Sequence, residues 1–562
     1  MIWKCTNLGQ NLAEIISQKS RMSLQELTAP QHLPVSGIQN MQEAAQVLAN
    51  GIHEKQPITI FGDYDADGIT STVILTELLR EMGGIVTYRL PKRMSEGYGI
   101  SMGAVASIEK GILITVDNGI AAIDEIRAAK EKGLTVIVLD HHLPMAESLP
   151  NADVIVDPHI EPEANIFTDY CGGSLALKLE EAFITFFGLN NPKMYWRHLV
   201  LAAIATVADV MPLRSENRWI VQKGLHSLRH YRNLLPHALN EILEASDLRS
   251  GTTETDIGFK IGPILNAAGR MRDDGAQLAV GALLETDENK AKTAAKALID
   301  LNEVRKEDVK TALDLAHKVI ADECLYGDVP LSLYIPNINE GIVGIVTGKI
   351  SEEFQVPAFV FTNSAENPDV WKGSGRSYGD ANLKEIVDAI APTVIRAGGH
   401  AGAAGVTVHK DNYLQMVDIM QATCQGYSAP DTDTLFYDME IEAKDMQTMY
   451  EEVRRYAPYG EGNPAPIFVL KDIVLSPRGG THYKLMGADS KHLKLFGNQF
   501  SAIGFDLAAK YIELGMPRMV NLIGTLSLNN FRNTKEYQIE ICDIQAVKQK
   551  TARNLLSSVK TL

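Results

Sequence analysis

Short apolar runs rich in β-branched residues recur through the first third of the chain, and an acidic residue follows each run within two positions. The runs cover residues 57–61, 111–116, 134–139 and 152–156, and helical stretches such as 121–132 separate them. Strands that alternate with helices predict a parallel sheet with both faces covered. Ligands bind beyond the carboxyl ends of the strands in such sheets, so we expect the acidic residues to meet at one edge.

The first run leads into the acidic loop Asp63-Tyr-Asp-Ala-Asp-Gly68. A calcium-binding EF-hand loop begins in the same way, but its twelfth position needs a Glu, where this chain has Ile74, and a helix should precede it. Here a predicted strand precedes the loop, and residues 70–82 after it have helical apolar spacing. We expect Asp65 and Asp67 to point the same way from an extended segment, where crowded carboxylates raise one another's pKa unless cations neutralise them.

Similar polar residues follow the other runs, namely Asp117-Asn-Gly, Asp140-His-His142 and Asp157-Pro-His. Clustered Asp with one or two His suits Mn²⁺ or Mg²⁺. Two such ions about 4 Å apart activate a water and stabilise the leaving oxygen of a phosphoester. A lone acid at a strand end is more often a helix N-cap, but several acids with a His pair favour a metal centre.

Asp209 is the single carboxylate of the apolar segment 201–213, which we interpret as a helix with Asp209 in its interior. Burying one charge among alanines and valines is costly unless the charge is paired or bound to metal. We therefore count Asp209 as a further metal ligand.

Composition narrows the class of protein. A chain of 562 residues is long enough for several cores, and its 45% hydrophobic and 22% charged content is that of a soluble globular protein. The N-terminus lacks the features of a secretory signal and no apolar run has transmembrane length, so we expect a cytoplasmic protein. The five cysteines form no Cys-x-x-Cys pair and favour neither disulfides nor zinc. A net charge of −17 argues against general coating of polyanions, so any nucleic-acid contact should be a local groove.

A helical segment at 285–322 contains neither Gly nor Pro and predicts a strut between two lobes across a cleft. Strands at 331–335 and 358–361 then indicate a second, smaller α/β lobe that carries Gly373-Ser-Gly-Arg376 and Gly398-Gly-His400. The segment 398–405 lacks the Walker Lys and the spaced GxGxxG, which disfavours ATP or NAD. Its glycines fit anion-binding backbone nests or tight helix packing about equally well.

The C-terminal part follows a turn-rich linker at 458–466 and changes to short alternating strands. Five strands, at 467–470, 491–496, 501–505, 520–524 and 537–542, predict a small β-barrel of OB type. OB-folds bind single strands through aromatic stacking and a basic groove, although charged residues on strands are more often simply solvated. The candidates for such a surface are Lys484, Lys491, His492, Lys494, Phe496, Phe531 and Arg532.

The successive motifs resemble those of the DHH phosphoesterases. They are Asp63-Tyr-Asp-Ala-Asp-Gly68, Val116-Asp-Asn-Gly119, Asp140-His-His142 and Val207-Ala-Asp-Val210. Within that superfamily the chain is most similar to the RecJ family of bacterial single-strand-specific 5′→3′ exonucleases. The similarity continues, in the family's order, through residues 93–99, 266–271, 373–377, 398–405 and 458–464.

The resemblance implies a division of the chain into five segments. These are an N-terminal extension at 1–45, a DHH catalytic domain at 46–284, a connecting helix at 285–325, a DHH-associated substrate-binding domain at 326–428 and an OB-fold domain at 429–562. The fold class expected is thus α/β, with two α/β lobes joined by a long helix and a C-terminal β-barrel.

The resemblance also implies two divalent metal ions, Mn²⁺ or Mg²⁺. The first ion would be held by Asp65 and Asp117 with Asp63, and the second by Asp67, Asp117, His141 and Asp209, so that Asp117 bridges the two. His142 would lie beside the scissile phosphate, with Asp140 behind it. Other DHH phosphoesterases often place a His four residues before the Asp65 position, where this chain has Phe61, which leaves one protein ligand of the first metal open.

On the substrate side, the resemblance implies that Arg93 grips the 5′ phosphate and that Tyr98 stacks on or wedges against a base. Arg270 would contact the backbone, and Ser374, Arg376 and His400 would reach the strand from across the cleft. A guanidinium suits these roles because its fork donates two parallel hydrogen bonds to a phosphate. Without the family likeness, Arg93 reads as a solvated charge and Tyr98 as a packing residue.

The expected function is a metal-dependent exonuclease that degrades single-stranded DNA from its 5′ end to mononucleotides in recombination and repair. Partners implied by the resemblance are single-stranded DNA, a helicase and a single-strand-binding protein, with a monomer as the default. One alternative is an oligonucleotide or cyclic-dinucleotide phosphodiesterase, which has no need of the extra barrel. Another is a non-catalytic scaffold that binds single strands, which predicts missing metal ligands, whereas the acids are present here.

Overall fold

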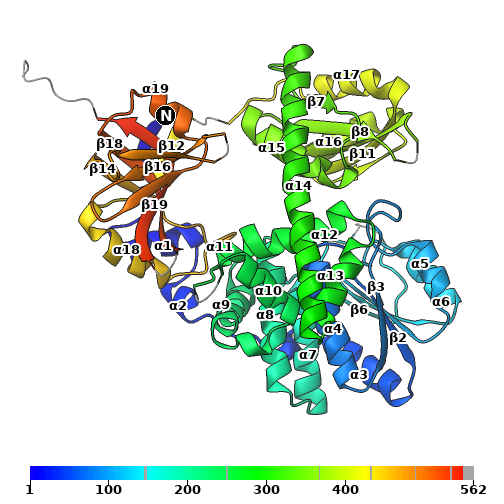
Figure 1. Cartoon of the computed structure of the whole chain (residues 1–562). Coiled ribbons are helices and arrows are strands. Elements are labelled where there is room, and N and C mark those ends of the chain that lie inside the picture. Colours follow the sequence, from blue (N-terminus) through cyan, green and yellow to red (C-terminus); the bar gives the residue numbers. More distant parts are fainter. Residues whose placement is uncertain are drawn as a thin grey trace, which may run out of the picture. The chain divides into compact units, whose positions relative to one another are not determined.

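The computed structural model describes residues 1–144, 148–248, 251–365, 367–430, 433–487, 489–531 and 534–547. The chain forms two compact units. The larger unit contains residues 32–211 and 219–430, and the smaller contains 1–31, 212–218 and the C-terminal part from 431. Most helices and many of the strands are labelled in Figure 1.

The first lobe of the larger unit is built on the predicted parallel sheet. Its strands are β2 (Pro57–Phe61), β3 (Ile85–Arg89), β4 (Ile112–Val116), β5 (Thr135–Leu139) and β6 (Val154–Val156). They are parallel and lie in the order β3-β2-β4-β5-β6. All five residues of β4 are buried, as expected for a strand covered on both faces. The carboxyl ends of β2, β4 and β5 therefore lie side by side, and each leads into an acidic segment.

Helices surround this sheet and extend the lobe. They are α3 (Met41–His53), α4 (Ala66–Glu81), α5 (Met102–Ser107), α6 (Ile123–Glu131), α7 (Gly172–Phe187), α8 (Pro192–Ala208), α9 (Ser215–His230), α10 (His237–Ala245), α11 (Glu254–Asp256), the π-helix η4 (Ile257–Ile261), α12 (Gly262–Met271) and α13 (Gly275–Leu284). The helix α4 packs against α7 and α8 and is almost wholly buried. It begins at Ala66, four residues before the predicted start at Thr70, because the Asp65 carboxylate caps its first backbone N–H groups.

The predicted connecting helix is α14 (Glu288–Asp322), which begins at 288 because Asp287 caps it by accepting a hydrogen bond from Lys290 N. Its first part packs against α10, α12 and α13. Its second part contributes Val309, Ala312, Ala316 and Ile320 to a separate hydrophobic core. The helix thus joins two cores within the larger unit, as predicted (Figure 1).

The second lobe has a mixed sheet in the order β10-β11-β9-β8-β7. The strands are β7 (Leu331–Tyr334), β8 (Ala358–Asn363), β9 (Val370–Arg376), β10 (Arg396–Gly399) and β11 (Ala403–His409), and the helices are α15 (Val343–Phe354), α16 (Leu383–Ile390) and α17 (Tyr413–Thr423). The glycine-rich segment, for which the sequence left an anion nest and helix packing open, forms the β10–β11 hairpin, in which Gly398 pairs with Gly405. Gly399 has φ of 152°, and a Cβ there would lie 2.3 Å from the Ala403 carbonyl oxygen, so the turn requires glycine.

The smaller unit contains a seven-stranded sheet in the order β13-β14-β18-β19-β17-β16-β15. The strands are β13 (Met439–Glu440), β14 (Phe468–Val474), β15 (Tyr483–Met486), β16 (His492–Phe496), β17 (Ser501–Gly504), β18 (Met519–Phe531) and β19 (Thr534–Ala546). Five of these correspond to the predicted strands, whereas β13 and β15 are too short to show alternation and were not predicted. The sheet is consistent with the expected OB fold.

The first residues of the chain belong to this smaller unit. β1 (Ile2–Cys5) pairs in parallel with β12 (Thr434–Tyr437), and α1 (Leu12–Ser20), α2 (Leu24–Thr28), α18 (Met446–Arg454) and α19 (Ala508–Glu513) complete the unit. The expected N-terminal extension at 1–45 is therefore shared between the two units, since α3 belongs to the larger one. The five-segment division of the chain stays a prediction.

A buried arginine explains why the short segment 212–218 belongs to the smaller unit. Arg218 is fully buried and donates to the carbonyl oxygens of Leu27 (2.7 and 2.9 Å), Tyr456 (2.7 Å) and Pro458 (3.1 Å). Asn463 donates to the Pro458 carbonyl at 2.7 Å. In the motif at 458–464, the carbonyl oxygen of the buried Pro458 thus accepts hydrogen bonds from two buried side chains.

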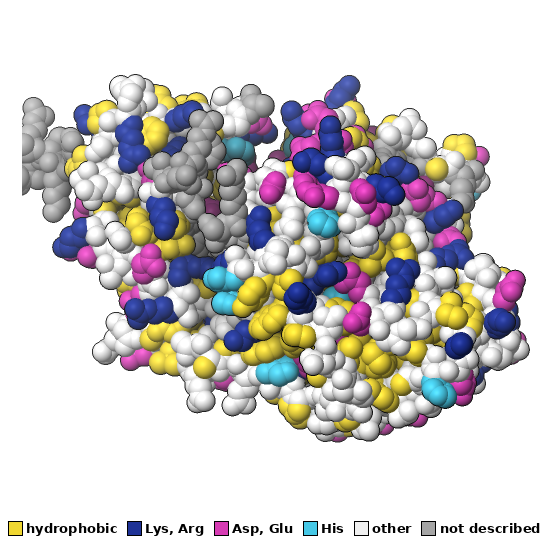
Figure 2. Space-filling view, turned by 60° about the horizontal axis from the view of Figure 1, so that its bottom comes forward, with side chains coloured by type: hydrophobic (Ala, Val, Ile, Leu, Met, Phe, Trp, Pro, Cys, Tyr) yellow, Lys and Arg dark blue, Asp and Glu magenta, His cyan; other side chains and the backbone are white. Residues whose placement is uncertain are grey.

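Among the described residues, no helix combines the length and apolar character that crossing a membrane requires. On the face of the molecule shown in Figure 2, Lys and Arg side chains are interspersed with acidic and hydrophobic ones. This distribution agrees with the acidic net charge of −17 and with the expectation that contacts with a polyanion are local.

Candidate metal centre

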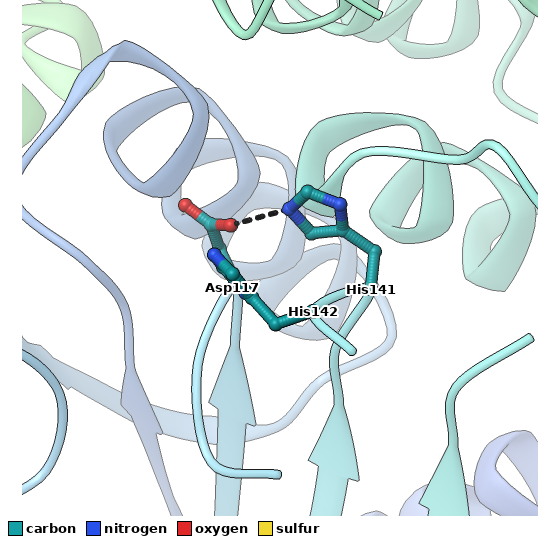
Figure 3. A group of neighbouring side chains, drawn as sticks. All are labelled: Asp117, His141 and His142. Carbon is teal, nitrogen blue, oxygen red and sulfur yellow. Dashed lines mark hydrogen bonds and ion pairs between the residues drawn. The ribbon is translucent and has the colours of Figure 1, made fainter. Parts of the chain in front are cut away.

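The acids that follow β2 and β4 converge at the carboxyl edge of the first sheet. Asp63, Asp65 and Asp117 each place a carboxylate oxygen within 4.8 Å of the others, and so form a potential metal-binding group. A second such group contains Asp67, His141 and Asp209. Asp117 connects the groups, because its Oδ1 lies 3.1 Å from Nε2 of His141 (Figure 3). The six predicted metal ligands therefore lie close together at this edge, and their role as ligands stays a prediction.

The turn after β4 directs Asp117 into this cluster. Asp117 adopts a left-handed backbone conformation with φ of 62°, which costs free energy for a non-glycine residue. Its N–H donates to the Leu139 carbonyl oxygen at 3.1 Å. Gly119 follows with φ of 115°, and a Cβ there would lie 2.3 Å from Oγ1 of Thr115. The strained turn places one carboxylate between the two groups.

Backbone N–H groups that sequence reasoning missed fix the carboxylate of Asp67. Asp67 Oδ2 accepts from Gly172 N at 2.7 Å, and Oδ1 accepts from Gly173 N at 2.6 Å, at the N-terminus of α7. A Cβ on Gly172 would lie 2.7 Å from Cβ of Asp117, and one on Gly173 would lie 2.5 Å from Cβ of Ala205. The glycine pair at the start of the helix at 172–187 was the available sequence signal.

The predicted geometry was wrong for Asp65 and Asp67. They do not share an extended segment: Asp65 is the N-cap of α4 and Asp67 lies in its first turn. Asp65 Oδ1 accepts from Asp67 N at 3.0 Å and from Gly68 N at 3.1 Å. Asp65 is therefore both the helix cap and a candidate metal ligand, because its Oδ1 accepts these hydrogen bonds and its Oδ2 stays available.

The predicted place of Asp209 was also wrong. Asp209 is not inside a helix but is the C-cap of α8, and its side chain is 30% exposed. The C-terminal end of a helix carries partial negative charge and disfavours a carboxylate. Burial together with the charges of Asp67 and Asp65 raises the pKa of Asp209 to about 8.

The cluster carries more negative charge than its surroundings neutralise. Burial and the charge of Asp65 raise the pKa of Asp63 well above its ordinary value, and burial and the charge of Asp67 do the same to the pKa of Asp117. Asp63 Oδ1 is buried and has no hydrogen-bond partner among the described residues. A buried carboxylate oxygen without a partner costs free energy that a cation removes. Oxygen and imidazole donors of this kind fit Mn²⁺ or Mg²⁺.

His142 lies beside the cluster, and the carboxylate of Asp140 holds its imidazole. Its Nδ1 is 2.8 Å from Asp140 Oδ1, and Asp140 Oδ2 accepts from Ile120 N at 2.9 Å. Burial lowers the pKa of His142, but the hydrogen bond and charge of Asp140 outweigh it and raise the pKa to about 9. The Tyr98 hydroxyl lies 3.2 Å from Nε2 of His142. Asp140 thus orients a half-exposed imidazole that is able to donate a proton.

Three of the predicted substrate residues form a cationic site in the larger unit. Burial and the charge of Arg93 lower the pKa of Arg270 to about 10, and the same two causes lower the pKa of Arg376. Arg270 donates to the Gly341 carbonyl oxygen at 3.3 Å, and Arg376 donates to Oγ of Ser374 at 3.0 Å. Among the described residues, no ion pair joins these arginines to a carboxylate. Guanidinium groups in such an arrangement are suited to bind an anion such as a phosphate.

The structure does not bring every predicted residue into the site. His400 is exposed in the β10–β11 turn, where Nδ1 accepts from Gly402 N at 3.1 Å, and no described contact joins it to the arginines. Asp157 is buried and accepts from His159 N, but it is absent from the potential metal-binding groups among the described residues.

Comparisons with known proteins agree with this geometry. The DHH family, N-terminal domain, matches residues 57–206, the DHHA1 domain matches 330–426 and the RecJ OB domain matches 437–543. The single-stranded-DNA-specific exonuclease RecJ of Haemophilus influenzae is 30% identical over 538 residues, which cover 91% of each chain. The chain belongs to the RecJ family. The RecJ exonuclease of Salmonella typhimurium is 31% identical over 549 residues and 91% of each chain.

A crystal structure of a RecJ family protein, Thermus thermophilus RecJ in complex with Mn²⁺, has the same fold. It matches with a TM-score of 0.79 and 25% identity over 97% of this chain and 80% of that chain. The predicted fold class, two α/β lobes joined by a long helix and an OB-type barrel, is therefore confirmed.

Phe61 replaces the imidazole that other DHH phosphoesterases often place before the acidic loop. In this RecJ family member Phe61 is fully buried and packs with Ile100, Ala104 and Leu113 in the core of the first lobe. The group around Asp63 consequently consists of carboxylates alone.

The predicted single-strand surface of the OB domain stays a prediction. Lys494 pairs with Glu536 at 3.0 Å, and the Arg478 guanidinium lies over the ring of Phe496 at 5.4 Å from its centroid. Lys484 on β15 is exposed, while Lys491 and His492 lie near Asp489 and Asp506 respectively. Arg532 lies outside the described residues, and so does the side chain of Phe531.

Proposed function

We propose that this protein is a single-stranded-DNA-specific 5′→3′ exonuclease that releases 5′-mononucleotides by phosphodiester hydrolysis with two divalent metal ions, in DNA recombination and repair. The observation that carries the proposal is the juxtaposition, in one compact unit, of two carboxylate-rich groups linked by Asp117 with three arginines that have no carboxylate partner among the described residues. One site suits cations and the other suits a phosphate. Family membership supports the same activity, since the curated relatives are named single-stranded-DNA-specific exonucleases.

The two groups would hold the metals as follows. Asp63 and Asp65 would hold one ion, Asp67, His141 and Asp209 would hold the other, and Asp117 would contact both. Bound Mn²⁺ or Mg²⁺ supplies an activated water and charge stabilisation at the scissile phosphate. The relative from Thermus thermophilus was crystallised with Mn²⁺ and also with Mg²⁺, which supports these two metals.

The protein's own groups bind and orient the strand. Arg93 and Arg376, with Ser374, would take the 5′ phosphate, and Arg270 would contact a second phosphate of the backbone. Tyr98 is exposed and carries its ring toward His142, where it would stack on the terminal base. His142, charged and oriented by Asp140, would donate a hydrogen bond or a proton to the leaving oxygen. His400 would approach the strand from the second lobe.

Single-strand specificity determines the partners that we propose. An enzyme that accepts one strand depends on another protein to separate the duplex, so a helicase and a single-strand-binding protein are the expected partners, in the cytoplasm of the cell. The OB domain would supply contacts with the strand beyond the active site. A monomer is proposed as the working state, which light scattering tests directly.

The test is product analysis on strands of single-stranded and duplex DNA labelled at one end, with Mn²⁺, with Mg²⁺ and with a chelator. We expect mononucleotides to be released from the 5′ end of single strands only, and no product with the chelator. Equal cutting of both forms, or release from the 3′ end, would contradict the proposal. A dinucleotide substrate in the same assay separates it from a short-oligonucleotide phosphodiesterase, which would cut the dinucleotide faster than the long strand.

A matched pair of variants separates catalysis from strand binding. Asp117→Asn removes the carboxylate shared by both groups, and Asp157→Asn removes an acid at the same sheet edge that belongs to neither group. Only the first should abolish hydrolysis, and it should still retain the strand in a binding assay. Hydrolysis by Asp117→Asn at the wild-type rate would refute the metal assignment.

A further inference from the structure

The tyrosine inside the acidic loop contacts the proposed phosphate-binding arginine. Tyr64 lies between Asp63 and Asp65, and the guanidinium carbon of Arg93 is 4.5 Å from the centroid of the Tyr64 ring. A guanidinium over an aromatic face is attracted by the ring quadrupole. This is the one contact of the Arg93 side chain that the described residues show, so the ring face supplies its support.

The backbone of Tyr64 packs against α12. A Cβ on Gly269 would lie 2.6 Å from the Tyr64 carbonyl oxygen and 3.2 Å from its Cβ, so that only glycine permits this approach. Asn266 Oδ1, one turn earlier on α12, accepts from Ala66 N at 2.7 Å. The helix α12 therefore holds the backbone of the acidic loop at Tyr64 and at Ala66.

A second residue near α12 holds the backbone that follows Arg93. The carboxylate of Asp273 accepts from Met94 N at 3.0 Å, from Ser95 N at 3.2 Å and from Ser95 Oγ at 2.6 Å. Arg93 is thus fixed twice, through its side chain by Tyr64 and through the following backbone by Asp273. These two supports restrict the Arg93 side chain before a phosphate binds. Less conformational entropy is therefore lost on binding.

We propose that Tyr64 and Asp273 are positioning residues that hold Arg93 at a set distance from the metal centre, so that a 5′ phosphate on Arg93 places the next phosphodiester at the metals. The inference rests on the proposed function and extends it to residues outside the metal and phosphate ligands. The aromatic ring of Tyr64, and not its hydroxyl, does the positioning, because the guanidinium lies over the ring face.

The test compares Tyr64→Phe, Tyr64→Leu and Asp273→Ala with wild type on single strands that carry either a 5′ phosphate or a 5′ hydroxyl. Asp274→Ala is the matched control, since Asp274 is an exposed neighbouring acid that pairs with Arg272 at 2.9 Å. For each variant kcat and KM are measured, and the Kd for Mn²⁺ is measured by calorimetry without DNA.

We expect Tyr64→Leu to raise KM on 5′-phosphorylated strands about tenfold and to reduce the preference for a 5′ phosphate by the same factor. Its Kd for Mn²⁺ should stay within about twofold of the wild-type value, because Asp63 and Asp65 remain in place. Tyr64→Phe should retain wild-type behaviour, Asp273→Ala should change KM in the same direction as Tyr64→Leu, and Asp274→Ala should change nothing.

An unchanged end preference in Tyr64→Leu would overturn the inference. Weaker Mn²⁺ binding together with an equal loss of activity on 5′-phosphate and 5′-hydroxyl strands would also overturn it. That result would show that Tyr64 only supports the loop that carries the metal ligands. A wild-type protein that cuts neither strand would instead overturn the proposed function, and this outcome is seen before any variant is made.

Discussion

The first lobe buries two clusters of acids with histidine, and they differ in how their charges are balanced. In the cluster at the sheet edge, Asp63, Asp65 and Asp117 face one another, and burial with mutual repulsion raises their pKa values. In the cluster among α4, α7 and α8, the fully buried His198 lies between Glu77 and Glu180, at 2.9 and 2.8 Å.

The second cluster is balanced within the protein. Burial raises the pKa of Glu77, but its bonds to His198 and Arg197 outweigh burial and leave it below its ordinary value. Burial lowers the pKa of His198, but the charges and hydrogen bonds of Glu180 and Glu77 raise it to about 9. Clustered acids therefore indicate a bound metal ion only where no positively charged side chain of the protein neutralises them. The predictions below test this difference.

The largest effect is expected from the unbalanced cluster. Asp117→Asn should reduce kcat for strand hydrolysis by at least about 10³-fold, because one carboxylate serves both metal-binding groups. Thermal unfolding should show that the variant stays folded, since the substitution removes a destabilising buried charge. Retention of more than about a tenth of wild-type kcat would show that Asp117 does not bridge two ions.

Substitution in the balanced cluster should change the stability of the fold instead of the activity. His198→Leu leaves Glu77 and Glu180 buried without their shared partner and should lower the free energy of unfolding by about 3 kcal/mol. Chemical denaturation measures this. His317, an exposed histidine paired with Glu353, provides the control, because His317→Leu should cost less than about 1 kcal/mol.

The same cluster should make stability depend on pH. Because the folded-state pKa of His198, about 9, lies above the ordinary value of 6.5, its contribution is complete below about pH 6.5 and is lost as pH rises through about 9. Between about pH 7 and about pH 8.5 the free energy of unfolding should fall by about 2 kcal/mol. Denaturation of His198→Leu over the same range should show this slope removed, and an unchanged slope would assign the proton to another group.

The smallest effect concerns the metals. Free Mn²⁺ at about ten times its Kd should stabilise the wild type by about 1.4 kcal/mol, because the ion binds the folded state alone. A thermal shift assay with Mn²⁺ and with a chelator measures the difference. His198→Leu should keep the shift and Asp117→Asn should lose it. A shift of equal size in both variants would place the ion away from the unbalanced cluster.

The alternation of strands and helices determined the first sheet and its acidic edge, because period and turn chemistry are local properties of the chain. The helix at 285–322 followed from its lack of Gly and Pro, and its start moved by three residues because Asp287 caps it. The six candidate metal ligands followed from strand-end positions and from the DHH likeness. Short strands such as β13 and β15 could not be predicted, because too few residues alternate.

Tertiary structure alone decided how the site is held. Gly172 and Gly173 orient Asp67 from a helix about a hundred residues away, and Asp209 reaches the cluster from the end of α8. The ring of Tyr64 meets the guanidinium of Arg93, and the glycines at 398–405 form a hairpin. The sequence by itself determined which side chains are able to bind metal and phosphate, because that depends on residue type and local spacing. Which of them meet, and which charges are left without a partner, depends on contacts between distant segments.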